Sequence, residues 1–223
     1  IDMIKAIDAA TNRGNLDEEE NDLWSAKDRL DRNNPKHKKL LLEIYSDLLI
    51  HYGEHRIDED RADYWGEVAL NLADELYKET GDVYYKFTKG DIYTKLGRIK
   101  FRTGSYKLAK DYYEFAEKIF REVNDEQLDK KNLISHVSIA LLETGRSYDA
   151  MGQYLKAKAK YEEALSLDQE MEKYFPQSST VKSNISTVLG DMAINAANLK
   201  NNEAANKYAR EAYEISKTIF EKT

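Results

Sequence analysis

The sequence predicts an all-α protein built from antiparallel helical hairpins stacked as a solenoid. Composition favours helix, because the 223 residues include only two Pro and ten Gly while 34% are charged. A repeat is also visible, since small residues recur 48 positions apart, at Ala109, Ala157 and Ala205 and at Ala116, Ala164 and Ala212. A period of this size is typical of stacked supersecondary units that contact only their neighbours.

The repeating unit reads as two helices joined by a short turn. Residues 96–120 and 144–168 align without a gap, sharing Gly-Arg, a second Gly, a Tyr two places later and Ala-x-x-x-Tyr-x-x-Ala. The second Gly of each copy, Gly104 or Gly152, marks the expected turn. Each copy is therefore predicted to form one helical hairpin.

This pattern resembles the tetratricopeptide (TPR) repeat. The matching positions are Tyr148, Gly152, Tyr154, Ala157, Tyr161 and Ala164. The sequence departs from the family at Lys100, which replaces an aromatic residue, and at Asn202, which replaces the turn Tyr. The period exceeds the family's 34 residues, and the excess would add about two turns to each helix. The resemblance implies a right-handed superhelix whose first helices line a concave surface.

Five hairpins, and about ten helices, are expected in one domain over residues 1–223. Their expected ranges are 1–34, 35–81, 82–125, 126–175 and 176–223. An acidic run, Asp17 to Glu20, opens the second helix, where carboxylates complement the positive end of the helix dipole. Pro35 and Pro176 are expected at helix starts, where a missing N–H costs nothing.

The second hairpin is expected to contain a longer turn than the others. Aligning Gly53 with Gly104 and Gly152 leaves four extra residues before Ala62. We therefore expect the turn at Gly53, with the segment from His55 to Asp60 as an insertion.

Charge and composition exclude several classes of function. The formal net charge of −7 and the pI near 5.3 disfavour binding to nucleic-acid phosphates. The absence of Cys excludes disulfides, thiolate catalysis and Cys-based zinc sites. No apolar run or signal-like segment is visible, so we expect no membrane partner and a cytoplasmic location. We also expect no cofactor.

One string resembles a catalytic motif. The sequence His51-Tyr52-Gly53-Glu54-His55 matches the His-x-x-Glu-His arrangement of inverted zinc peptidases, which needs both His on one helix face. With the turn at Gly53 the two imidazoles would point apart. We therefore expect no metal site and no enzyme, with a hydrolase built on this string as the rival interpretation.

The preferred functional surface is the solvent face of the first helix in each hairpin. This face combines apolar and Arg side chains, which suits a groove for a protein or peptide ligand. The expected groove residues are Asp91, Thr94, Arg98, Phe101, Arg102, Ile139, Leu142, Arg146, Asp149 and Asn198, with Thr187, Gly190, Ile194 and Ala197 on the same face of the last copy.

The two Arg residues indicate the chemistry of the expected ligand. Arg98 and Arg146 occupy equivalent positions and are expected to grip an acidic side chain or a C-terminal carboxylate. The alternatives are that each Arg pairs with a local acid such as Asp91, Asp149 or Glu143, and that the apolar groups pack between first helices.

Two further family resemblances give rival binding functions. The long hairpins resemble the sensor domain of bacterial peptide-pheromone receptors, in which concave Asn side chains hold the peptide, and Asn198 matches that pattern. The segment from Val83 to Tyr93 resembles part of the 14-3-3 phosphopeptide receptors, although Thr94 and Lys95 replace their phosphate-contacting Arg-Tyr pair.

Overall fold

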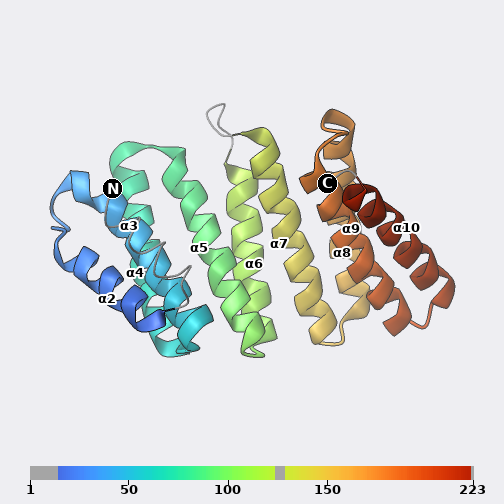
Figure 1. Cartoon of the computed structure of the whole chain (residues 1–223), viewed down its shortest axis with the longest axis horizontal. Coiled ribbons are helices and arrows are strands. Elements are labelled where there is room, and N and C mark those ends of the chain that lie inside the picture. The colour runs from blue at the N-terminus through green and yellow to red at the C-terminus, as the bar shows by residue number, and fades with distance from the viewer. Residues whose placement is uncertain (1–14, 124–128, 222–223) are drawn as a thin grey trace. The chain divides into compact units, whose positions relative to one another are not determined.

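A computed structural model describes residues 15–123 and 129–221 of the chain. In these ranges it contains nine α-helices, one π-helical segment and no strand, so the prediction of an all-α array of helical hairpins is confirmed (Figure 1). The expected first helix, within residues 1–12, lies outside the described residues. The elements are α2 (Leu16–Asp28), α3 (Pro35–Ile50), η1 (His51–Arg56), α4 (Glu59–Thr80), α5 (Val83–Arg102), α6 (Tyr106–Glu122), α7 (Lys130–Ala150), α8 (Tyr154–Tyr174), α9 (Ser179–Asn198) and α10 (Asn202–Phe220).

The backbone contacts divide the chain into two compact units, Ile1–Ile99 and Lys100–Thr223. The first unit holds α2, α3, η1, α4 and most of α5. The second holds the end of α5 and the helices from α6 to α10, each packed against the next. The two units are described separately below.

Polar side chains set most helix starts. Asn15, Asn34, Asp58, Asp129, Ser178 and Asn201 each accept a hydrogen bond from a backbone N–H of the first turn. Pro35 occupies the first position of α3 as expected. Pro176 does not start a helix, because Ser178 caps α9 and the helix begins at Ser179.

The repeated small residues of the second unit lie where helices approach closely. Ala109, Ala116, Ala157 and Ala164 are all fully buried. Between α7 and α8, Gly145 lies so close to the Tyr161 ring that a Cβ atom there would stand 2.5 Å from it. The 48-residue spacing therefore reports packing between helices in these hairpins.

In the first unit the core is built around aromatic and aliphatic side chains. Trp65 stacks on Tyr45 with ring centroids 5.4 Å apart and meets Trp24 edge-to-face at 5.5 Å. Gly66 of α4 lies against Leu96 of α5, where an added Cβ would come within 2.7 Å of the leucine side chain. These contacts join α2, α3, α4 and α5.

The turn of the second hairpin is at Ile57, so the prediction of a turn at Gly53 is wrong. Left-handed backbone conformations occur at equivalent positions in four hairpins, at Ile57, Gly104, Gly152 and Lys200. Ile57 precedes Gly104 by 47 residues, whereas the later intervals are 48. Gly53 instead lies buried inside η1, within the continued first helix.

A single extra residue explains this shift. The carbonyl of Tyr52 accepts a hydrogen bond from the N–H of Asp58, six residues on, while Lys100 in the next hairpin accepts from Ser105, five residues on. A π-helical turn accommodates one inserted residue without breaking a helix. The insertion is therefore one residue within η1 and not four residues in the turn.

Candidate functional site

In the second unit the first helices α7 and α9 lie side by side and are joined by polar contacts. The amide of Asn184 donates to the Ser135 hydroxyl at 3.2 Å, near the start of each helix. Towards their ends, the amide of Asn195 donates to Asp149 at 2.7 Å. The repeat thus places two equivalent helix faces next to each other, which is the arrangement expected for a shared binding surface.

Arg146 links the two helices at a point between these two contacts. Its Nε donates to Asp191 Oδ2 and its Nη1 to Glu143 Oε1, both at 2.7 Å. Burial alone would lower the pKa of this guanidinium, yet the two carboxylates raise it above its ordinary value. Burial raises the pKa of Asp191 although Arg146 opposes the shift. The alternative of a local acidic partner, Glu143, is therefore what the structure shows for Arg146.

Arg98, the equivalent residue in the first unit, is more open. Its side chain is 52% exposed and its Nη2 lies 2.6 Å from Glu54 Oε1. Its partner is thus an acid from η1 and none of the three carboxylates named from the sequence.

The other polar positions on the predicted face also have partners within their own unit. Asp149 accepts hydrogen bonds from the Tyr161 hydroxyl at 2.9 Å and from Asn195. In the first unit Asp91 pairs with Lys95 at 3.0 Å, and the Thr94 hydroxyl donates to the carbonyl of Gly90. The second unit also contains Phe101, edge-to-face with Tyr106, and the exposed Arg102.

The apolar positions of the predicted face differ in solvent exposure. Ile139 and Ile194 are exposed, Ile194 by 61%, and Asn198 is exposed at the end of α9. Leu142 is buried, so the prediction that it faces solvent is wrong. Because α7 contacts α6, α8 and α9, it buries more of its surface than a helix with one packing stripe.

Gly190 lies on this face, at the position equivalent to Leu142. A Cβ atom built there would have no heavy atom within 4 Å. The packing of the described chain therefore does not require glycine at this place in α9. Ile194 is one helical turn further along the same helix.

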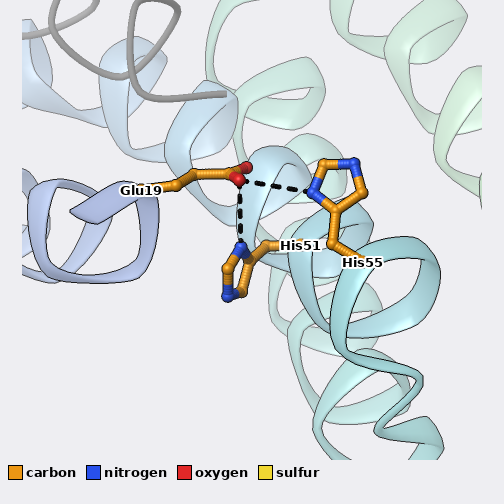
Figure 2. Close-up of side chains that lie close together, drawn as sticks. All are labelled: Glu19, His51 and His55. Atoms are coloured by element: carbon orange, nitrogen blue, oxygen red, sulfur yellow. Dashed lines mark ion pairs between the residues drawn. The ribbon is translucent and has the colours of Figure 1, made fainter. Parts of the chain in front are cut away.

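The zinc-peptidase-like string is arranged differently from the sequence-based expectation. His51 and His55 both belong to η1, and their ring centroids are 6.0 Å apart. Both rings turn towards Glu19 of α2 (Figure 2). The expectation that the imidazoles point apart is wrong, because no turn separates them. Glu54 instead pairs with Arg98.

Comparison with known proteins agrees with the geometry of the hairpins. A family model of the tetratricopeptide repeat matches residues 90–122 and 140–171, which correspond to α5–α6 and α7–α8. The chain is a TPR-like repeat protein. The 48-residue offset of the glycine turns, from Gly104 to Gly152, shows that its repeats are longer than the family's typical 34 residues.

Solved structures share the TPR-like fold at low sequence identity. BtubC (BKLC) from P. vanneervenii is 19% identical with a TM-score of 0.76, covering 96% of this chain and 78% of that one. The signal transduction ATPase PH0952 from Pyrococcus horikoshii, which has a tetratricopeptide repeat sensor, is 20% identical with a TM-score of 0.72, covering 98% of this chain and 30% of that one.

Rap proteins are also similar. The apo form of RapI is 14% identical with a TM-score of 0.71, and all of this chain aligns with 73% of it. A Rap protein complexed with Competence and Sporulation Factor is 16% identical with a TM-score of 0.57, and all of this chain aligns with 67% of it. No curated protein sequence matched the chain. Among the described helices, none has both the length and the apolar character needed to cross a membrane.

Proposed function

We propose that this TPR-like chain is a protein- or peptide-binding module without catalysis of its own, and that the first-helix face of α7 and α9 is its binding surface. The observation that carries the proposal is the open space above Gly190, beside the exposed side chain of Ile194. We call the surface formed by Ile139, Gly190, Ile194 and Asn198 the α7–α9 face.

A glycine in the middle of a helix needs a reason. It costs about 0.5–1 kcal/mol relative to Ala, because the free chain loses more conformational freedom. At Gly145 the reason is the Tyr161 ring, whereas at Gly190 the described chain provides none. A ligand backbone that approaches α9 closely would supply one, and the apolar side chain of Ile194 would bury area against it.

Recognition of an acidic ligand group by Arg98 is a separate proposal, because Arg98 belongs to the other unit and is not part of the α7–α9 face. Arg146 already contacts two carboxylates, so a ligand carboxylate there would have to displace one of them. Arg98 has half of its side chain exposed and can form parallel hydrogen bonds to a carboxylate.

A second candidate function is a peptide-sensing regulatory domain. The supporting observation is the structural similarity to Rap proteins, one of them complexed with Competence and Sporulation Factor, and to the sensor repeats of PH0952. The exposed amide of Asn198 could hydrogen-bond to a peptide backbone on the α7–α9 face. Both candidates use the same surface.

Substitutions that keep the fold intact test the surface. Peptides selected from a random display library on the wild-type chain are titrated against Gly190→Ala, Ile194→Ala and Gln169→Ala proteins. We expect the first two to bind at least about tenfold more weakly, although Gly190→Ala is the more stable protein. Gln169, exposed on α8, provides the matched control. Equal affinity for all four proteins would refute the assignment.

A further inference from the structure

Three buried side-chain atoms converge in the first unit without hydrogen bonds. Glu19 and His51 are 4% and 0% exposed, while His55 is partly buried. Oε2 of Glu19 lies 3.4 Å from Nδ1 of His51 and 3.3 Å from Nδ1 of His55 (Figure 2). None of the three atoms has a hydrogen-bond partner. Leaving buried polar atoms unpaired is costly, so this arrangement requires an explanation.

Protonated histidines explain the cluster poorly. A hydrogen bond between an imidazolium and a carboxylate is typically about 2.7–2.9 Å long and well aligned. The two contacts here are longer and lack hydrogen-bond geometry. Nearby guanidinium groups do not compensate Glu19 either, because Arg56 pairs with Asp17 and Glu20, and Arg61 with Glu20 and Asp58.

A metal ion fits the same distances. Zinc binds His nitrogen at about 2.0–2.1 Å and carboxylate oxygen at about 2.0–2.2 Å, so tetrahedral ligands stand roughly 3.3–3.5 Å apart. The two carboxylate–imidazole distances fall in this range, and all three ligand atoms lie within 4.8 Å of one another. Two imidazoles and one carboxylate form a donor set that suits divalent transition metals.

We propose that Glu19, His51 and His55 bind one divalent transition-metal ion such as Zn²⁺, with water as the fourth ligand. Metal binding to each histidine through Nδ1 leaves Nε2 to carry the proton. Nε2 of His51 lies 3.4 Å from Glu20 Oε2. Arg56 Nε donates to the same nitrogen at 3.4 Å, and it gives up this hydrogen bond when Nε2 carries the proton, while its Nη2 keeps the pairs with Asp17 and Glu20. Glu20, itself held by the Tyr52 hydroxyl at 2.7 Å, can accept the Nε2 proton, as carboxylates behind metal-bound histidines commonly do.

The cluster is particular to this hairpin. Residues 48 and multiples of 48 beyond His51 are Ile99, Ser147 and Asn195, all buried but with no metal-binding imidazole. The inserted residue in η1 also occurs only in this hairpin among those described. The repeat architecture therefore does not require these side chains. A bound ion would connect α2 to η1 and stabilise the first unit.

Zn²⁺ titration of the chelator-treated full chain tests the site. We expect saturable one-to-one binding by calorimetry and a melting temperature that rises when Zn²⁺ is added. Glu19→Gln and His55→Ala should each weaken binding at least about 100-fold, because each removes a ligand. His37→Ala, which removes a histidine outside the cluster, should bind Zn²⁺ as the wild type does.

Folding of each variant is checked by circular dichroism before titration. Glu19→Gln should fold without metal, because a neutral amide replaces a buried charge of similar shape. The proposal is overturned if the wild type shows no one-to-one binding, or if folded Glu19→Gln and His55→Ala proteins bind Zn²⁺ as tightly as the wild type. Loss of binding in His37→Ala alone would also overturn it. The test does not involve the α7–α9 face, so its result is separate from the proposed function.

Discussion

At the scale of single residues, Asp168 of α8 is a carboxyl group whose ionisation the fold opposes. It is 2% exposed and accepts a hydrogen bond from the Ser138 hydroxyl at 2.8 Å. Burial raises the pKa of Asp168 from 3.8 to about 6, against the effect of hydrogen bonds from Ser138 and Asn184. Since the folded-state pKa is the higher one, the stabilising contribution is present below pH 3.8 and is lost as the pH rises through about 6.

Asp168→Asn should therefore stabilise the protein at neutral and alkaline pH. The amide keeps the shape and an acceptor oxygen but carries no charge that burial must desolvate. We expect a gain at pH 8 of up to about 3 kcal/mol, which narrows as the pH falls towards 4. Urea unfolding of both proteins at several pH values measures this difference. A gain that does not depend on pH would contradict the assignment to ionisation.

Two helical glycines give an internal comparison. Ala at Gly145 would place its Cβ 2.5 Å from the Tyr161 ring, so Gly145→Ala should destabilise the protein by about 1–3 kcal/mol. Ala at Gly190 meets nothing, so Gly190→Ala should stabilise it by about 0.5–1 kcal/mol. The melting temperatures of the two variants test this comparison. Changes of the same sign would show that the space around one of the two glycines is wrongly described.

At the scale of elements, the end of η1 stores backbone strain. Ile57 has φ 58°, a conformation that costs a β-branched residue about 1–2 kcal/mol, and its side chain is 68% exposed. Glycine occupies the equivalent positions Gly104 and Gly152.

Replacing Ile57 with Gly should consequently stabilise the protein by about 1 kcal/mol, because the left-handed conformation no longer carries a penalty and little apolar area is lost. Chemical denaturation measures the change. Lys200→Gly, at the equivalent turn with φ 60°, should act in the same direction. Destabilisation by Ile57→Gly would mean that the isoleucine side chain makes contacts that the structure does not contain.

The same element shows what the sequence could not predict. Helices around Ala109 and Ala157 follow from spacing alone, because two equal copies fix the register. The π-helical segment does not, since one inserted residue changes the offset only from 48 to 47, and Gly53 resembled the turn glycines. A turn at Gly53 would place His51 and His55 on different helices. The sequence analysis therefore did not predict that both imidazoles face Glu19.

At the scale of the whole chain, one repeat register, interrupted by the single residue inserted in η1, describes the hairpins from α3 to α10. It predicted the exposure of Ile139 and Asn198 on the candidate surface. It could not predict the burial of Leu142, because burial depends on how many helices surround α7. Nor could it connect Glu19 to His51, which lie 32 residues apart on different helices. The contacts between different helices, at the candidate surface and at the Glu19–His51–His55 cluster, could therefore not be predicted from the sequence.

The most direct test of the central claim is hydrogen–deuterium exchange of the chain with and without a display-selected peptide. The account predicts that bound peptide slows amide exchange in α7 and α9, most strongly around Gly190 and Ile194, while exchange in α8 changes little. Protection confined to α8, or to helices of the first unit, would contradict the claim that the α7–α9 face binds the ligand.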